Sequence, residues 1–425
     1  MEETGNTMSD DSDRYSWFRL GEEVRRRDFL RLGLTTAGML AIAACGGGGG
    51  AGTSGQTTGP DFKVGMVVPQ SKTYAALGES LHNGFMLYLA KVGGTAGGRK
   101  ITVLLGDEED NLPAAQKATQ TLVEQNSVDM ICGYVASPIA DALCTNYLAP
   151  QKIPTIVMNA GVNALSRAHR SPYVYRTSFT NWQPTHPMGD YLNGQGVKKV
   201  TLAYAKYGAG IETAQSFKET YKGQIMAEVA TDWPSTVDFS AAISRIASSG
   251  AEAIYSFYSG QDAINFFKQA KQVGLFDKIK FFGSGFAVEQ DVLQAIPNEV
   301  PVGAITALHW AYGLDTKENA DFKSAYQNKY GKQADVFAVQ GYDTARVVVD
   351  ALNAVKGKVD KGSPDAFLTA ISKVAFRSPR GDFRFDPASN NPSQTIYIRQ
   401  LVRDPKEGLI NKPISSVPNV ADPGK

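Results

Sequence analysis

The stretch Val128–Leu143, VDMICGYVASPIADAL, decides how this chain folds, because it reads as a buried strand that turns directly into a helix. Its first residues form a short apolar run of strand length, and Gly133 ends that run. Ser137 is a favoured N-cap residue, and Pro138 suits the first helical position. We predict an anion site here, because a helix N-terminus at the carboxyl end of a strand attracts negative charge and open α/β sheets bind ligands at that edge.

A carboxylate held by Ser137 is the central prediction for this turn. The start of the helix leaves backbone donors for the ligand at Ile139 and Ala140, and Ala136 lies beside them. The alternative is that Ser137 only caps its own helix. Because a hydroxyl has two lone pairs and one proton, it can also serve both purposes.

Strand-then-helix alternation runs through the chain twice. Strands are predicted at 61–69, 101–105, 128–132, 153–158 and 173–178, and then at 199–205, 225–230, 253–257, 279–283, 303–308 and 395–402. Helices are predicted at 78–92, 112–125, 182–192, 211–222, 239–248, 261–273, 288–296, 317–330 and 342–355. Such alternation predicts parallel sheets with crossover helices, and its repetition predicts two similar lobes.

Length and charge narrow the class of protein. A chain of 425 residues exceeds what one hydrophobic core usually covers, so two domains are expected. Lys and Arg number 43 against 42 Asp and Glu, and no basic stripe is interleaved with aromatic residues, so we expect no nucleic-acid partner. The only long apolar segment lies near the N-terminus, and no internal membrane span is predicted.

The first sixty residues have the pattern of an export signal followed by a linker. Arg25–Leu30 carries twin arginines before an apolar segment, Leu32–Ala44, that is too short to span a bilayer. We predict a Tat-like signal peptide over 1–44, with a simple Sec signal as the alternative. Ile42–Cys45 looks like a lipobox, which makes Cys45 a lipidated, membrane-anchoring residue. The Gly-rich segment 45–60 is then a flexible tether.

Other chemical groups in the sequence favour a binding role. The acidic run Asp107–Asp110 precedes a predicted helix, where acids favour the helix dipole, and no His or Cys accompanies it, so no metal or cofactor is expected. We expect no disulfide between Cys132 and Cys144, because buried free cysteines are common core residues. An exported esterase is the enzyme alternative, but the G-x-S-x-G elbow is absent and Gly283–Gly285 lacks its spacing.

Several local strings, in their order along the chain, resemble the periplasmic-binding-protein type I family, specifically the leucine/isoleucine/valine-binding-like solute-binding subunits of ABC transporters. The strings are Lys63–Gly65, Gly106–Glu108, Gly133–Ser137, Tyr175–Thr177, Lys206–Gly208, Ala270–Leu275, Gly341–Ala345 and Ser378–Gly381. The resemblance implies two Rossmann-like lobes of a Venus flytrap, joined by three crossover strands and closing around a small ligand. Lobe 1 is expected at 61–179 plus 310–378, and lobe 2 at 180–309 plus 379–425.

The same resemblance assigns ligand contacts by position. The family's carboxylate-binding serine falls on Ser137, and companion contacts fall on Asn159, Gly161 and, across the cleft, Tyr207. The family's ammonium-binding aromatic and acidic residues fall instead on two small residues, Ser259 and Gly285. A buried, unpaired ammonium costs several kcal/mol, so a free branched-chain amino acid is disfavoured. Placing Glu at Gly285 is expected to shift preference toward amino acids.

Aromatic residues in predicted strand-end loops and crossovers suggest what replaces the ammonium anchor. They are Tyr74, Tyr134, Tyr207, Tyr258, Phe286, Trp310 and Tyr342. Aromatic walls with a few polar anchors suit a flat ligand, so we predict an aromatic or otherwise apolar carboxylate. Only three or four of these rings are expected to touch it, and His309 beside Trp310 is a further possible donor.

Together these features predict a non-enzymatic, monomeric binding protein outside the cytoplasm. The resemblance implies that it passes a small carboxylate to a membrane permease served by an ATPase subunit. Two alternatives stay within the binding class. The ligand is a branched-chain amino acid or an amide, or the protein is a sensor that signals to a membrane kinase.

Overall fold

The computed structural model describes residue 57 and residues 59–234 and 236–424, which form one compact unit. The predicted signal peptide, the lipidation site Cys45 and most of the predicted tether lie outside the described residues. Across the described ranges, none of the helices combines the length and the apolar character that crossing a membrane requires.

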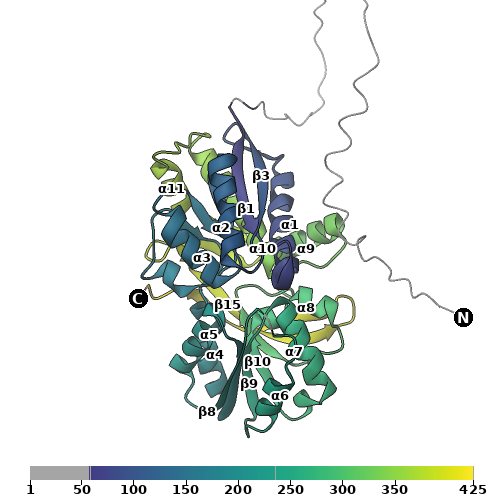
Figure 1. The fold of residues 1–425 in the computed structure, drawn as a ribbon. Coiled ribbons are helices and arrows are strands. Elements are labelled where there is room, and N and C mark those ends of the chain that lie inside the picture. The colour runs from purple at the N-terminus through teal and green to yellow at the C-terminus, as the bar shows by residue number, and fades with distance from the viewer. Residues whose placement is uncertain (1–56, 58, 235, 425) are drawn as a thin grey trace, which may run out of the picture. The chain divides into compact units, whose positions relative to one another are not determined.

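The first lobe is built on a six-stranded sheet with the order β2-β3-β1-β4-β5-β6 (Figure 1). Its strands are β1 (Phe62–Val68), β2 (Thr95–Ala96), β3 (Arg99–Asp107), β4 (Met130–Gly133), β5 (Thr155–Val157) and β6 (Val174–Arg176). All neighbours pair in parallel except β2 with β3. Its helices are α1 (Ala75–Lys91), α2 (Leu112–Gln120), α3 (Ser137–Leu143), α9 (Lys317–Tyr330), α10 (Val336–Ala354) and α11 (Asp365–Ser372).

The second lobe holds a seven-stranded sheet with the order β16-β15-β11-β10-β9-β7-β8. Its strands are β7 (Lys199–Ala205), β8 (Gln224–Thr231), β9 (Ala253–Phe257), β10 (Lys280–Ser284), β11 (Ile305–Leu308), β15 (Gln394–Asp404) and β16 (Gly408–Val420). Its helices are α4 (Trp182–Gly194), α5 (Gly208–Thr220), α6 (Ser240–Ala247), α7 (Gly260–Gln272) and α8 (Gln290–Ala295). The chain passes between the two sheets three times, after β6, after β11 and after β14, which confirms the predicted fold class.

Several elements depart from the sequence predictions. The last strand pair, β15 with β16, is antiparallel, and β16 was not predicted. Two of its 13 residues are prolines, which weaken a strand signal but are tolerated on an edge strand. Helix α10 begins at Val336 rather than 342, because Asp335 caps it by accepting from the Ala338 N–H. Helix α11 was also missed.

A small third sheet bears on the lobe boundaries. It consists of β12 (Ala375–Ser378), β13 (Gly381–Asp386) and β14 (Asn391–Pro392). Phe383 and Phe385 belong to the same hydrophobic cluster as the core of the first lobe. We therefore propose that lobe 1 extends to β14 and that the third crossing follows it, rather than falling at the predicted residue 379.

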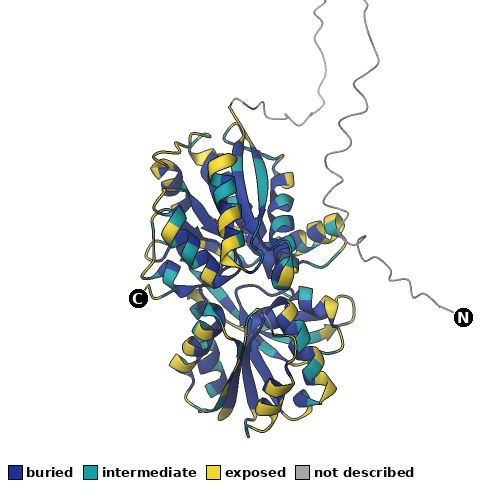
Figure 2. Ribbon diagram, in the orientation of Figure 1, coloured by how far each residue is buried: buried dark blue, intermediate teal, exposed yellow. Residues whose placement is uncertain are grey.

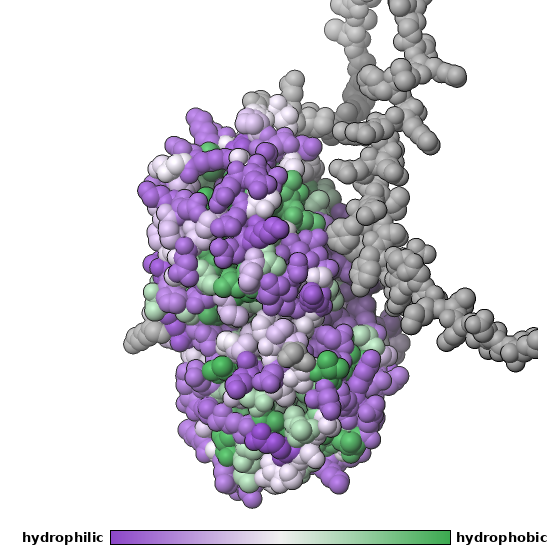
Figure 3. Space-filling model, viewed as in Figure 1, coloured by the Kyte–Doolittle hydropathy of each residue, from purple (hydrophilic) through white to green (hydrophobic). Residues whose placement is uncertain are grey.

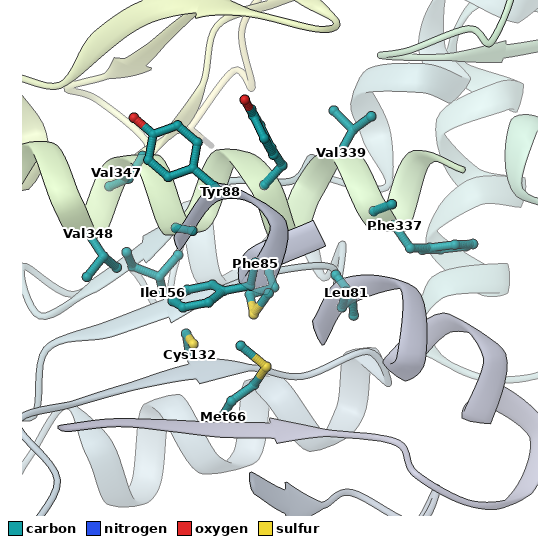
Figure 4. Close-up of a cluster of buried hydrophobic side chains, with 14 of the residues drawn as sticks. Met66, Leu81, Phe85, Tyr88, Cys132, Ile156, Phe337, Val339, Val347 and Val348 are labelled. Carbon is teal, nitrogen blue, oxygen red and sulfur yellow. The ribbon is translucent and has the colours of Figure 1, made fainter. Parts of the chain in front are cut away.

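Packing of apolar side chains between helices and sheet holds the first lobe together. Figure 4 shows Phe85 of α1 and Val348 of α10 gathered with Met66 and Cys132 of the strands, and all four are buried. Dark, buried positions lie along the strands and the inner sides of the helices in Figure 2. On the face shown in Figure 3, hydrophilic residues dominate and hydrophobic ones form small, scattered groups. Cys132 and Cys144 are both free and buried.

Candidate ligand-binding site

The turn between β4 and α3 presents one hydroxyl group without a partner. Ala136, not Ser137, is the N-cap residue, and Ser137 is the first residue of the helix. The prediction of Ser137 as a cap is therefore wrong. Ser137 is 1% exposed, and its Oγ has no hydrogen-bond partner among the described residues. A buried hydroxyl in this state is available to a ligand.

The backbone donors expected at this turn are already used. The Ile139 and Ala140 N–H groups both donate to the Ala136 carbonyl. The Ala136 N–H donates to Glu108 Oε1 at 2.7 Å, and the Val135 N–H donates to Glu108 Oε2 at 2.8 Å. Burial raises the pKa of Glu108 to about 8, although these two hydrogen bonds lower it. Glu108 therefore braces the turn from inside, and of the predicted donors only the Ser137 hydroxyl stays free.

Helix α5 of the second lobe faces this turn. A Cβ placed on Gly208, the first residue of α5, would lie 3.7 Å from the Ser137 Cβ. Tyr207 is the N-cap residue of α5, and Ala209 follows in its first turn. The N-terminal ends of α3 and α5 thus meet from opposite lobes, which brings two helix dipoles with positive ends to one place.

A cleft forms where these ends meet. Its lining residues come from both lobes and from the crossing after β6: Tyr74, Leu77, Val135, Ser137, Asn159, Gly161, Phe179, Asn181, Tyr207, Ala209, Phe257, Ser259, Phe286 and Phe337. The lobes are in contact, and the cavity between these side chains has a volume of about 20 Å³, room for about one water molecule. Seven residues predicted as ligand contacts lie in this lining: Tyr74, Ser137, Asn159, Gly161, Tyr207, Ser259 and Phe286.

Phenylalanine rings form the apolar wall of the cleft around Phe286. The ring centroid of Phe286 lies 4.8 Å from that of Phe179 and 5.9 Å from that of Phe337. Phe257 meets Phe286 edge-on at 6.3 Å. Such spacing lets a further flat ring stack or insert edge-on, which is the geometry that aromatic pairs prefer.

A hydrogen-bonded chain joins Trp233 to two aromatic residues of the cleft lining, Tyr74 and Tyr207. Trp233 Nε1 donates to the Tyr74 hydroxyl at 2.9 Å, and that hydroxyl donates to the Tyr207 hydroxyl at 3.1 Å. The Trp233 ring stacks on Tyr207 at 4.5 Å. Burial raises the pKa of Tyr207, so its hydroxyl stays protonated and keeps its own proton to donate.

Three predicted aromatic contacts lie elsewhere. Tyr134 points into the core behind the turn, where its hydroxyl is 2.8 Å from Thr119 Oγ1. The Tyr258 ring packs against Phe266 at 4.9 Å in the core of the second lobe. Tyr342 packs edge-on to Tyr88 at 4.9 Å. Tyr134 and Tyr258 each follow a strand end, where a side chain can face either the cleft or the core, and Tyr342 lies inside α10.

The remaining predicted contacts also lie outside the cleft. Trp310 is fully buried, and its Nε1 donates to Asn319 Oδ1 at 2.9 Å. His309 stacks behind Phe179 at 5.5 Å, and burial lowers its pKa well below the usual range. Ala136 is buried and does not line the cleft.

Gly285 faces a buried arginine rather than the cleft. A Cβ on Gly285 would lie 2.2 Å from Arg399 Nη2 and 2.7 Å from the Leu308 Cβ. Arg399 Nη2 donates to the Gly285 carbonyl at 3.0 Å, and Arg399 Nη1 pairs with Glu289. This geometry argues against the expectation that Glu at position 285 supplies an ammonium anchor, because its Cβ would meet Arg399 and Leu308.

Sequence reasoning missed seven lining residues: Leu77, Val135, Phe179, Asn181, Ala209, Phe257 and Phe337. Phe179 and Asn181 follow the Tyr175–Thr177 string that marks the first crossing, so their position was a usable signal. Phe337 lies five residues before the predicted start of its helix, and no pattern in the sequence pointed to it. Among the described residues, no group of three or more His, Cys, Asp or Glu side chains could hold a metal ion.

A cleft between two α/β lobes, lined by rings and a few unpaired polar atoms, defines a binding protein for a small solute. The chain belongs to the periplasmic binding protein family, whose model matches residues 61–406. It is 31% identical to "Leu/Ile/Val-binding protein homolog 6" of Brucella melitensis over 370 residues, which cover 85% of this chain and 93% of the relative.

The solved structures that resemble this chain are also solute-binding proteins. A solute-binding protein of an ABC transporter from R. palustris, crystallised with benzoate, is 34% identical, with a TM-score of 0.79 and coverage of 86% of this chain and 98% of that one. A second, from Rhodopseudomonas palustris BisB5 with 3,4-dihydroxybenzoic acid, is 31% identical, with a TM-score of 0.81 and coverage of 86% and 99%. The family and these neighbours are solute-binding proteins, not enzymes, and the family is one of exported, extracytoplasmic proteins.

Proposed function

We propose that this protein binds an aromatic carboxylate in the cleft between its lobes and delivers it to an ABC-type permease. The observation that carries the proposal is the buried Ser137 Oγ, which lines the cleft and has no partner within the described part of the chain. It lies at the meeting point of two helix N-termini, where the dipoles favour negative charge.

The proposed acid contacts come from opposite lobes. The Ser137 hydroxyl and the Tyr207 hydroxyl each have a proton to donate, and hydrogen bonds to an ionised acceptor are about twice as strong as neutral ones. Because each lobe supplies one donor, an acid that accepts from both holds the lobes together. This is the usual way in which a ligand stabilises a closed two-lobed protein.

The apolar wall supports an aromatic ring on the same ligand. Phe179, Phe257, Phe286 and Phe337 offer ring faces and edges beside the proposed acid site. None of the described residues that line the cleft is an aspartate or a glutamate that could offset an ammonium group, which disfavours a free amino acid. The cavity of about 20 Å³ is smaller than an aromatic acid, so binding requires lining rings to turn or the lobes to separate.

The structures with benzoate and 3,4-dihydroxybenzoic acid support the ligand class, because both neighbours are at least 31% identical to this chain. A permease, its ATPase and the lipid anchor on Cys45 complete the proposed assembly, and we expect the binding protein itself to be a monomer. A ligand sensor for a membrane kinase is the second candidate, since it requires the same cleft.

Calorimetric titration with benzoate, an aliphatic acid of similar size, benzamide and leucine tests the ligand class. We expect saturable binding of benzoate and weaker or no binding of the other three. Preferential binding of leucine, or equal binding of benzamide and benzoate, would refute the aromatic carboxylate. Uptake of the acid by cells that lack this protein, compared with cells that carry it, separates transport from sensing.

A further inference from the structure

Both asparagine side chains that line the cleft turn their NH₂ groups away from it. Asn181 Nδ2 donates to Glu212 Oε2 at 2.7 Å, and Asn159 Nδ2 donates to Gln340 Oε1 at 2.8 Å. Neither Glu212 nor Gln340 belongs to the lining. In each amide the carbonyl oxygen is therefore the group left for a ligand, and a carbonyl oxygen only accepts.

The orientation of Asn181 is fixed by the chemistry of its partner. Glu212 is a carboxylate that also accepts from the Asn163 backbone N–H, at 3.0 and 3.2 Å to its two oxygens. Burial raises the pKa of Glu212, although the hydrogen bonds from Asn181 and Asn163 lower it in part. Because a carboxylate needs donors, the NH₂ group of Asn181 must face it, and a flipped amide would place two acceptors together.

The carbonyl oxygen of Asn181 is buried and unsatisfied. Asn181 is 2% exposed, and its Oδ1 has no hydrogen-bond partner in the described ranges. A Cβ on Gly161 would lie 2.3 Å from this oxygen, so the glycine leaves the room that Oδ1 occupies beside the cleft. A buried acceptor without a donor is costly, and a bound ligand with a donor relieves that cost.

The proposed acid site and the Asn181 carbonyl oxygen lie beside different residues of α5. A Cβ on Gly208 would lie 3.7 Å from the Ser137 Cβ, whereas Glu212, four residues later, accepts from Asn181. Four residues correspond to about 6 Å along a helix axis, roughly one turn. An acid group beside Ser137 and Tyr207 therefore leaves another part of the same small molecule near Asn181. A second acid group is excluded there, because it would face a carbonyl oxygen.

We infer that the ligand carries a hydrogen-bond donor in addition to its carboxylate, such as a ring hydroxyl, and that Asn181 Oδ1 accepts from it. Glu212 is the positioning residue that keeps this oxygen turned to the cleft. This inference rests on the proposed function and narrows its ligand class from aromatic acids to hydroxylated or amino-substituted ones.

Titration of the wild-type protein with matched acids gives the first test. The ligands are benzoate, 3-hydroxybenzoate, 4-hydroxybenzoate and the methyl ethers of the two hydroxy acids, which keep the oxygen but lose its proton. We expect at least one hydroxybenzoate to bind about three- to tenfold more tightly than benzoate, the range for one hydrogen bond. Its methyl ether is expected to bind more weakly than the hydroxy acid.

Two variants then locate the acceptor. Asn181→Ala is expected to abolish the advantage of the hydroxy acid, so that the ratio of hydroxybenzoate affinity to benzoate affinity falls to about one. Glu212→Gln permits both orientations of the Asn181 amide, so the advantage is expected to shrink in a protein that keeps its side chain at 181. Asn83→Ala is the matched control, because Asn83 is a buried asparagine outside the cleft, and we expect it to leave the affinity ratio unchanged.

The outcomes separate the two proposals. If benzoate binds as tightly as every hydroxybenzoate, or if Asn181→Ala weakens all the acids equally, the inferred donor contact is wrong while the aromatic-acid function stands. If no aromatic acid binds, both fail. Should Asn181→Ala not fold, the ratio of hydroxybenzoate affinity to benzoate affinity in wild type and in Glu212→Gln still tests the donor contact.

Discussion

The Tyr74 and Tyr207 hydroxyl oxygens lie 3.1 Å apart, although the two residues belong to opposite lobes. Tyr74 ends the loop after β1, and Tyr207 caps α5, so this hydrogen bond joins the lobes directly beside the cleft. Trp233 extends the chain by donating to Tyr74. Each donor in such a chain polarises the next, which makes the free Tyr207 proton a better donor to an acid.

Removal of the Ser137 hydroxyl is expected to affect binding and not folding. Ser137→Ala should weaken binding of an aromatic acid by about 1 to 3 kcal/mol, the range for a hydrogen bond to a charged group. The unfolding temperature should change little, because Oγ has no partner in the folded chain described here. Calorimetric titration and thermal unfolding measure the two effects.

Ser80, a buried serine whose hydroxyl has a hydrogen-bond partner, serves as the control for Ser137. Ser80 Oγ donates to Asp335 Oδ2 at 2.6 Å, away from the cleft. Ser80→Ala should therefore lower stability and leave ligand affinity unchanged. Equal losses of affinity and stability in Ser137→Ala would show that Ser137 has a structural role instead.

The Tyr207 hydroxyl is expected to contribute to acid binding across the lobes. Tyr207→Phe keeps the ring that stacks on Trp233 but removes the proton that the ligand needs, so affinity should fall by about 1 to 3 kcal/mol. Tyr134→Phe loses only the contact with Thr119, and we expect a stability loss of about 1 kcal/mol without an effect on affinity. Unchanged affinity in Tyr207→Phe would remove this hydroxyl from the proposed acid site.

Asp262 should make stability depend on pH. It lies in the first turn of α7, and burial, then the charge of Asp110, raises its pKa from 3.8 to about 7. Since the folded protein holds this proton more tightly than the unfolded chain, the contribution to stability is complete below about pH 4 and is lost as the pH rises through about 7. The loss is on the order of 1 to 4 kcal/mol.

Asp262→Asn isolates this effect. Denaturant unfolding of wild type and variant between pH 4 and 8 should show the variant gaining stability relative to wild type as the pH rises. Asp315→Asn, at an exposed aspartate, should show no such trend. Parallel curves for wild type and Asp262→Asn would contradict the raised pKa.

Substitution of Gly285 is expected to damage packing, not to change ligand preference. Gly285→Ala places a methyl group against the Arg399 guanidinium and Leu308, and overpacking of this kind costs about 1 to 3 kcal/mol. The benzoate-to-leucine affinity ratio should not change. Gly285→Glu should destabilise further, because Arg399 already pairs with Glu289. Leucine binding by a well-folded Gly285→Glu protein would contradict this account.

Predictions for single elements succeeded where local pattern is strong. β7, β9 and α9 have the predicted bounds, because an apolar run between turn residues, or a capped helix ended by Gly331, needs no distant partner to define it. β16 failed for the opposite reason. It is a strand only because β15 supplies hydrogen bonds along its length, and its exposed residues give little signal by themselves.

The sequence alone determined the alternating α/β order, the two lobes and a polar turn after β4, since these depend on periodicity and on residues close in the chain. Only the tertiary structure decided which side chains share the cleft. In the folded protein, Tyr134 and Tyr258 point into the core, and the Ala136 N–H donates to Glu108. Asn181 lies at the cleft beside Gly161. The physical reason is that the direction of a loop side chain, and the partner of each buried polar atom, are set by groups far away in the chain.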